Sequence, residues 1–364
     1  MKSVVILCVG GLAGIVVAVS VGSMVGGRSR SEPDWRDVAL ASTLANRRSY
    51  TLPLNNPDMI PAGRADHMKD TDLVLGIVFH GTARAYPWWL TSNYHVVNDT
   101  VDEDPLLITL CEVCGGAAAF SPIVPDLPGI TLTFQISGVG HGTIELGDHQ
   151  TWSKWHPFLG TALSGPLEGR SLDRYPLLLL SWREWKDLYP DSLVANGSPE
   201  LRERFHGSES GHIGDAVIPD LFLRSANLVD NRLERHELVL GFTFPNTGKA
   251  YAVPADSLVP FPNLFLAVLD SEPVLIVRQA ELAMTAFDLK PIGYDAEFAL
   301  VSKAPLLFRS TDGLIWNAFG IRQDGEESES RLPTARSYLT EWYEWVSHSP
   351  QTEIVSSVRI VSCE

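Results

Sequence analysis

The feature that most constrains this chain is an internal duplication. Leu73-Val-Leu-Gly76 recurs as Leu238-Val-Leu-Gly241, and Arg84-Ala-Tyr86 recurs at the same offset as Lys249-Ala-Tyr251. Further matches keep their order along the chain: Pro105–Ile108 with Pro273–Ile276, Ala119-Phe120 with Ala286-Phe287, Trp155 and Gly160 with Trp316 and Gly320, and Arg174-Tyr-Pro176 and Trp185 with Arg331-Leu-Pro333 and Trp342. Two copies are too few for a solenoid, so this order predicts a pair of similar units packed on each other.

Each copy is expected to begin with strands and to end in a helix. Residues 73–79 and 83–86 flank a His-Gly-Thr turn, which is typical of a hairpin, and further strands are expected at 106–110, 117–120 and 130–136. Aromatic residues at helical spacing predict closing helices at 181–189 and 338–346. The expected fold class is therefore α+β with mostly antiparallel sheet, in two pseudo-repeat units each closed by a short helix.

The sequence predicts five segments. Residues 1–30 form a membrane anchor or signal segment, and residues 31–54 form a linker or arm. Residues 55–197 form the first repeat unit, which carries the candidate site. Residues 198–235, rich in Gly, Ser and charged side chains at their start, form a second linker. Residues 236–364 form the second, degenerate repeat unit.

The N-terminal segment has the length of a membrane span. No charged residue interrupts Val4–Val25, and a helix needs about 20 apolar residues to cross the hydrocarbon layer. The run exceeds a usual signal-peptide core and the Gly-Gly-Arg-Ser-Arg that follows is a poor cleavage site, so a retained anchor is favoured over a cleaved signal. Lys2 lies at one end and Arg28 and Arg30 at the other, which leaves the orientation open. We expect membrane attachment through this segment and an extracytoplasmic body, periplasmic or extracellular.

The charge balance argues against a nucleic-acid partner. The chain has 28 Lys and Arg residues against 44 Asp and Glu residues, a formal net charge of −16. Such a surface repels a phosphate backbone, and no dense basic cluster in the sequence offsets it.

The strongest chemical motif is Cys111-Glu-Val-Cys114-Gly-Gly, because Cys8 lies in the predicted anchor and Cys363 in the tail. Two thiolates at this spacing in a turn form half of a metal site, and histidine or carboxylate ligands would have to complete it. The second copy has Gln279 and Leu282 at the matching places, so the fold does not require either sulfur. A metal site, a redox-active or structural disulfide, and inert buried thiols all remain open.

Four histidines are also special to the first copy. His95 is matched by Pro260, and His141, His149 and His156 have no histidine at the aligned places. We expect His95 and His141 to complete a metal site with Cys111 and Cys114, with packing or loop roles as the alternative. His149 and His156 lie next to Trp-rich segments, where packing could explain them.

Asp99 and Arg84 complete the catalytic candidates. Asp99 could orient His95, or it could merely start a turn. Arg84 could clamp an anion, but the second copy keeps Lys249 there, which favours a structural cation.

These motifs together resemble a bacterial and archaeal family known as domain of unknown function 3179. The resemblance extends over about residues 55–355 and rests on several motifs in a shared order, which are Arg84–Pro87, His95–Asp99, the Cys-x-x-Cys pair, Ser137-Gly138, Thr151-x-Ser153-x-Trp155, Gly160, Gly165–Leu167 and Gly169. It implies an exported, duplicated protein with no assigned reaction. The family usually has Tyr-Cys-Pro-Leu-Cys where this chain has Leu110-Cys-Glu-Val-Cys114, and its Tyr, Asn and Met positions fall where this chain has Val139–Gly147 with His141. These departures predict altered surroundings of the thiols.

The expected function is an extracytoplasmic metal-binding or redox protein acting on an unidentified small molecule or protein. Copper suits two thiolates and an imidazole best, and zinc suits the same ligands. The alternatives are a metal-free thiol–disulfide protein and a non-catalytic binding module with a static disulfide. Neither a Gly-x-Ser-x-Gly elbow nor a Gly-rich phosphate loop is present in the sequence.

Overall fold

The computed structural model describes residues 52–127, 129–205, 217–226, 230–292, 297–324, 330–355 and 357–361. The predicted anchor, with its flanking Lys2, Arg28 and Arg30, lies outside these residues, as do Cys8 and Cys363. Within the described residues, no helix combines the length and the apolar composition needed to cross a membrane.

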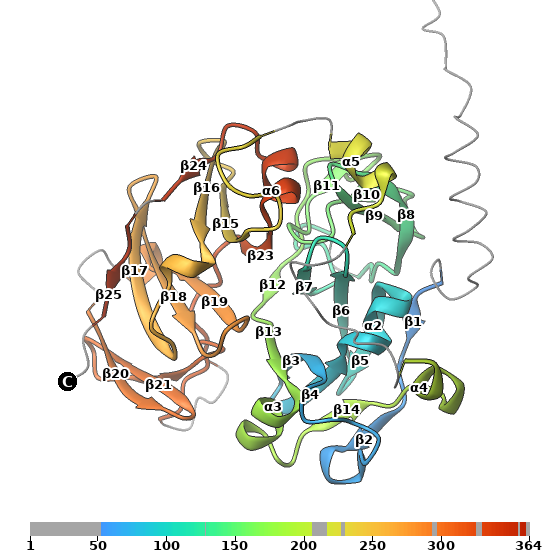
Figure 1. Cartoon of the computed structure of the whole chain (residues 1–364), viewed down its shortest axis with the longest axis horizontal. Helices are drawn as coiled ribbons and strands as arrows, with labels where there is room; N and C mark the ends of the chain where they lie inside the picture. Colours follow the sequence, from blue (N-terminus) through green and yellow to red (C-terminus); the bar gives the residue numbers. More distant parts are fainter. Residues whose placement is uncertain are drawn as a thin grey trace, which may run out of the picture. The chain divides into compact units, whose positions relative to one another are not determined.

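Six small sheets make up the described part of the chain (Figure 1). Three of them come from the first copy, residues 55–197, together with the segment just before it. The first sheet has the order β13 (Leu178–Ser181), β3 (Leu73–Phe79), β4 (Thr82–Pro87), β14 (Leu193–Ala195) and β2 (Met59–Pro61). The second has the order β1 (Leu54–Asn55), β5 (Val96–Val101), β6 (Asp104–Cys111), β7 (Gly116–Phe120) and β12 (Arg174–Tyr175). The third has the order β11 (Ala162–Ser164), β10 (Lys154–Trp155), β9 (Thr143–Asp148) and β8 (Phe134–Gly140).

The second copy, residues 236–364, supplies the other three sheets. The fourth sheet has the order β23 (Ser337–Glu341), β15 (Leu238–Phe244), β16 (Lys249–Pro254) and β24 (Glu353–Ile354). The fifth has the order β19 (Met284–Asp288), β18 (Glu272–Arg278), β17 (Asn263–Leu269) and β25 (Arg359–Ile360). The sixth has the order β20 (Phe298–Lys303), β21 (Leu306–Ser310) and β22 (Ile315–Asn317).

The helices are short. Each α-helix of the described residues spans 7 residues: α2 (Trp88–Tyr94), α3 (Trp182–Leu188), α4 (Pro199–Phe205), α5 (Asp220–Ala226) and α6 (Trp342–His348). Single 3-10 turns lie at η1 (Ala62–Arg64), η2 (Ala255–Ser257) and η3 (Lys290–Ile292). Helices α4 and α5 fall within the segment that we expected to be a linker.

The expected α+β class is wrong, because the chain is mostly β and its six sheets have a β-propeller arrangement. The helices do not close a unit. After α3 the chain returns as β14, which pairs with β4 in parallel, and after α6 it returns as β24, which pairs with β16 in parallel. Each of these helices is therefore a connection between two strands of one sheet. The duplicated sequence segments nevertheless form sheets with the same strand order, since β13-β3-β4-β14 corresponds to β23-β15-β16-β24.

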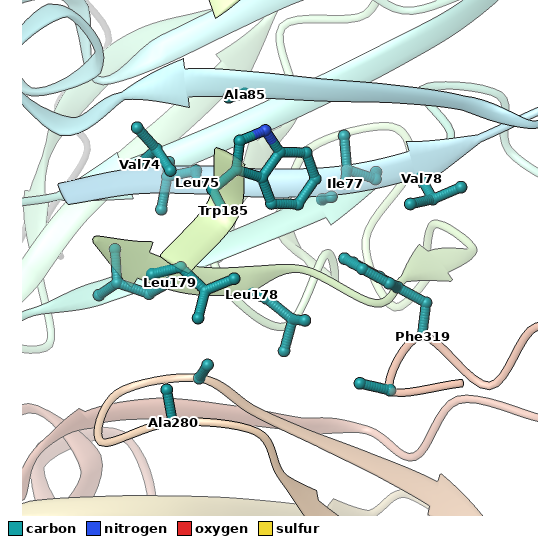
Figure 2. Packing of buried hydrophobic residues seen from close by; sticks show 14 of the residues in the cluster. Val74, Leu75, Ile77, Val78, Ala85, Leu178, Leu179, Trp185, Ala280 and Phe319 are labelled. Atoms are coloured by element: carbon teal, nitrogen blue, oxygen red, sulfur yellow. The ribbon is translucent and has the colours of Figure 1, made fainter. Parts of the chain in front are cut away.

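A tryptophan packs on a glycine at the same place in each copy, and this packing makes Trp345, rather than Trp342, the counterpart of Trp185. Trp185 of α3 and Trp345 of α6 are fully buried, and their indole nitrogens donate to Ser192 Oγ and Thr352 Oγ1, each at 2.9 Å. In Figure 2 the indole of Trp185 lies at strand β3, which carries Val74, Leu75 and Ile77. A methyl group on Gly76 or Gly241 would come within 2.2 Å of the adjacent indole, so only glycine fits beneath each tryptophan.

We predict that Gly76→Ala and Gly241→Ala each lower the free energy of unfolding by about 1–3 kcal/mol or more, because the indole must move out of its packed position. Chemical denaturation of each variant measures the change. Gly63→Ala is the matched control, since nothing lies within 4 Å of the position that its methyl group would take. Equal effects at all three positions would contradict this account of the glycines.

Candidate functional site

The Cys-x-x-Cys motif forms the turn of a hairpin. Strand β6 ends at Cys111, which pairs with Gly116 at the start of β7. Gly115 has φ +67° in the turn, and a methyl group on Gly116 would come within 2.5 Å of the Phe158 ring, so the motif needs both glycines. In the second copy β18 ends at Arg278 and β19 begins at Met284. That turn closes without sulfur, as the sequence comparison predicts.

The two thiols are free, fully buried and hydrogen-bonded to each other. Cys114 Sγ also lies 3.3 Å from Thr143 Oγ1 on β9 and 3.9 Å from the carbonyl of Cys111. Burial raises the pKa of Cys111, but hydrogen bonds from Cys114, Thr143 and the backbone outweigh burial, so the net shift is downward. Burial, the hydrogen bond to Cys111 and the negative charges of Cys111 and Glu344 raise the pKa of Cys114. The pair is therefore asymmetric, with Cys111 as the more acidic thiol.

The second copy holds this turn in place. The carbonyl of Cys114 accepts hydrogen bonds from Thr340 Oγ1 at 2.9 Å and from the Glu341 backbone N–H at 3.0 Å. Both donors lie at the end of β23, immediately before α6. The strand and helix of one copy thus pack directly on the thiol turn of the other.

A buried carboxyl group on α6, that of Glu344, acts electrostatically on the Cys114 thiol. Glu344 is fully buried and accepts hydrogen bonds from the Tyr338 hydroxyl, at 3.3 Å to Oε1 and 3.2 Å to Oε2. Burial raises the pKa of Glu344 to about 7, against lowering by His348, Thr340, Tyr338 and His141. A carboxyl group with a pKa near neutrality can take up and release a proton at physiological pH. We did not predict Glu344 from the sequence, because we treated the second copy as degenerate.

Three imidazoles adjoin Glu344. His156 Nε2 lies 3.5 Å from Glu344 Oε1, and the His156 ring centroid lies 4.3 Å from that of His348, which in turn is 5.9 Å from that of His141. Burial lowers the pKa of His156 and of His348 to about 3, so both rings are neutral at pH 7 and the contact with Glu344 is not an ion pair. His141 is exposed, at the turn between β8 and β9.

His95 and His149 have other surroundings. His95 ends α2 in a left-handed conformation with φ 61°, and its Nδ1 lies 3.1 Å from the Leu110 carbonyl. Burial lowers the pKa of His95 to about 4, which is typical of a neutral core histidine. His149 is exposed and stacks on Trp152, with ring centroids 6.3 Å apart.

The structure does not place the expected metal ligands together. Within the described residues, which include Cys111, Cys114, His95 and His141, no group of three or more His, Cys, Asp or Glu side chains could hold a metal ion. The expectation that these four residues form a metal site is therefore corrected, whereas binding of copper or zinc by the protein stays a prediction. Cysteines and histidines occur together in the first copy, but this pattern in the sequence does not specify which side chains share one point in space.

Asp99 and Arg84 form an ion pair away from the thiol turn. Arg84 Nη1 donates to Asp99 Oδ2 at 2.8 Å, and the Tyr86 hydroxyl donates to the same oxygen at 2.6 Å. In the second copy Lys249, which aligns with Arg84, pairs with Asp270 at 2.7 Å. Both copies therefore place a cation at this position and neutralise it with a carboxylate. This agrees with the interpretation of Arg84 as a structural cation rather than an anion clamp.

The fold and the site together define an internally duplicated, mostly β protein with a buried dithiol at the contact between its copies. A protein family of unknown function, DUF3179, matches residues 53–357, and the chain belongs to that family. This confirms the resemblance inferred from the sequence motifs. Comparison with curated proteins and comparison with solved structures each gave no match.

Glu344 should make stability depend on pH. Its pKa in the folded chain is raised to about 7 from 4.5, so its stabilising contribution is complete below about pH 4.5 and is lost as pH rises through 7. We predict that the free energy of unfolding of the wild type falls relative to that of Glu344→Gln between pH 5 and 8, by at most about 3 kcal/mol. Urea denaturation of both proteins across this range gives the difference. A difference that does not vary with pH would show that Glu344 does not titrate there.

Proposed function

We propose that the protein is a thiol–disulfide redox protein in which Cys111 and Cys114 exchange with a low-molecular-weight disulfide. The observation that carries this proposal is the hydrogen-bonded, asymmetric thiol pair beside a carboxyl group whose pKa is about 7. Both sulfurs are fully buried, which favours a small exchange partner over the surface of a folded protein.

The exchange has two balanced steps. The Cys111 thiolate attacks one sulfur of the substrate disulfide, which breaks the substrate S–S bond and releases one thiolate. Cys114 then passes its proton to Glu344, and the Cys114 thiolate attacks the Cys111 sulfur and expels the second substrate thiolate. The two protons of the dithiol end on the two released thiols, one by way of Glu344. The substrate disulfide is reduced, and Cys111 and Cys114 are oxidised to a disulfide.

Two neighbours support these roles. Thr143 Oγ1 lies 3.3 Å from Cys114 Sγ, and a hydroxyl at that distance can stabilise a developing thiolate. The Glu344 charge is close enough to raise the pKa of Cys114, so protonation of Glu344 would favour the Cys114 thiolate. In the free dithiol, Cys111 is therefore the attacking group and Cys114 the resolving group.

We predict that Cys111 and Cys114 are oxidised together, as a two-electron couple. The protein carrying Cys8→Ser and Cys363→Ser is equilibrated with dithiothreitol buffers of graded redox potential, and its remaining thiols are alkylated and counted by mass spectrometry. We expect both thiols to disappear in one transition, with a midpoint above about −300 mV as for a labile rather than a structural disulfide. Cys111→Ser and Cys114→Ser should each abolish the transition.

Two outcomes would contradict this proposal. One is that no disulfide forms even in the most oxidising buffer. The other is stoichiometric copper or zinc in the purified protein that is lost on Cys111→Ser substitution, since thiolates that hold a metal are not available for exchange.

Glu344 should control the second step of the exchange, in which the Cys111–Cys114 disulfide forms. We predict that the rate of disulfide formation with a small disulfide shows an inflection near pH 7 in the wild type and that Glu344→Gln is slower and lacks this inflection. Stopped-flow measurements from pH 5 to 9 test it. Glu341→Gln is the matched control, because Glu341 is equally buried and lies near the thiol turn but pairs with His236 at 2.8 Å. Loss of the inflection in both variants would remove Glu344 from the mechanism.

A further inference from the structure

Arg174 has no counter-ion among the residues that the structure describes. It lies on β12, partly buried, with its guanidinium carbon 4.9 Å from the centre of the Phe120 ring. Its Nη2 atom is buried and makes no hydrogen bond, and no carboxylate of the described residues forms an ion pair with it. A buried guanidinium normally has a bidentate anionic partner, because removing it from water is costly.

A second guanidinium lies nearby. Arg336 Nη1 donates to Ser171 Oγ at 3.1 Å and Nη2 donates to Thr161 Oγ1 at 2.6 Å, while its Nε is buried and unpaired. These partners are hydroxyl groups, which cannot neutralise the charge. Burial first, and then the charge of Arg336, lowers the pKa of Arg174 to about 9, so Arg174 still carries its charge at pH 7. Two like charges are thus held near each other in a chain whose net charge is −16.

A small cavity adjoins Arg174. Its volume is about 50 Å³, and its lining includes Arg174, Ser337, Tyr338 and Gly115, the residue that follows Cys114. A single water needs about 10–15 Å³ of such space, so the cavity has room for a few waters or for one anion of about four or five heavy atoms. Arg174 is the one charged side chain of the lining, which is otherwise mainly apolar, and the Arg336 charge acts on Arg174 from outside the lining. The buried, unpaired Nη2 of Arg174 beside this cavity has the chemistry of an oxyanion site.

We propose that Arg174, assisted by Arg336, binds a small oxyanion, either a free phosphate or a small carboxylate, in this cavity beside the thiol turn. A planar guanidinium recognises both groups through paired hydrogen bonds, and the bound charge removes the repulsion between the two arginines. The site combines β12 of the first copy with the segment before β23 of the second, so a bound anion also links the copies. This inference does not rest on the proposed thiol chemistry.

The test is ligand-dependent stability of the full chain. Thermal unfolding and isothermal titration calorimetry are run with phosphate, formate and acetate, each against chloride at equal ionic strength, because phosphate also stabilises proteins generally by exclusion from their surface. We expect at least one oxyanion to bind saturably to the wild type, with a stabilisation that follows the binding isotherm. Phosphate and the two carboxylates are separate arms and decide which oxyanion the site prefers.

Two variants make the assignment specific. Arg174→Gln should weaken anion binding by about tenfold or more, as expected for the loss of a charged hydrogen-bonding partner. Arg336→Gln should weaken it less, since its Nη atoms already have partners. Arg331→Gln is the matched control, because Arg331 is the duplicate of Arg174 but donates to the Val78 carbonyl at 3.1 Å. It should leave the affinity unchanged.

A further result separates this proposal from a structural role for Arg174. Without an oxyanion, Arg174→Gln should melt no lower than the wild type, because it removes an uncompensated charge. With saturating oxyanion, the wild type should melt at a higher temperature than Arg174→Gln. The proposal is overturned if no oxyanion binds saturably, if Arg174→Gln binds like the wild type or no more weakly than Arg331→Gln, or if Arg174→Gln is destabilised equally with and without the anion.

Discussion

The carbonyl of Cys114 joins the thiol turn of the first copy to strand β23 of the second. It accepts hydrogen bonds from Thr340 and from the backbone of Glu341, and these bonds fix the end of β23 against the thiol turn. Helix α6 begins at the next residue, so Glu344 lies in its first turn, from which its negative charge acts on Cys114. The same helix places His348 against His156. In the proposed exchange, this contact supplies the carboxyl group that takes up the Cys114 proton.

The duplication explains how such a site can exist without cost to the fold. Both copies bury a tryptophan on a glycine of the first strand, and both close the β6–β7 or β18–β19 hairpin with a turn of similar length. The second turn has Gln279 and Leu282 in place of the cysteines, so packing does not require the sulfurs. Each copy can therefore contribute a different part of one site. The first copy supplies the thiols and His156, and the second supplies Glu344, Tyr338 and His348.

The sequence predicted the elements with local signatures better than the site. The repeated Leu-Val-Leu-Gly segments are strands β3 and β15, and the cysteine turn follows strand β6 as expected. Ser181 caps α3 in a capping box with Glu184, which is a local pattern. The prediction of a second closing helix at residues 338–346 was only partly correct, because the helix begins at Trp342. Tyr338, Trp342 and Trp345 have helical spacing, but Tyr338 belongs to β23, because it is in register with Gly241 of β15.

The missed residues depend on contacts between distant parts of the chain. Thr340 and Cys114 are 226 residues apart, and no periodicity within either copy indicates that they touch. His95 was expected at the thiols because it lies close to them in the sequence and is absent from the second copy. Its role as the left-handed end of α2, with Nδ1 against the Leu110 carbonyl, accounts equally well for a residue that only one copy needs. A difference between duplicates therefore identifies a special residue without saying whether its role is chemical or structural.

The central claim is that Cys111 attacks and Cys114 resolves, and trapping the intermediate tests it most directly. When Cys114→Ser is mixed with a small disulfide, the account predicts that a stable mixed disulfide accumulates on Cys111, because the resolving thiol is gone. Intact-protein mass spectrometry with peptide mapping identifies the modified residue. The Cys111→Ser protein should form no such adduct at neutral pH, since burial and neighbouring negative charge raise the pKa of Cys114. An adduct on Cys114 in Cys111→Ser, together with none on Cys111 in Cys114→Ser, would contradict the account.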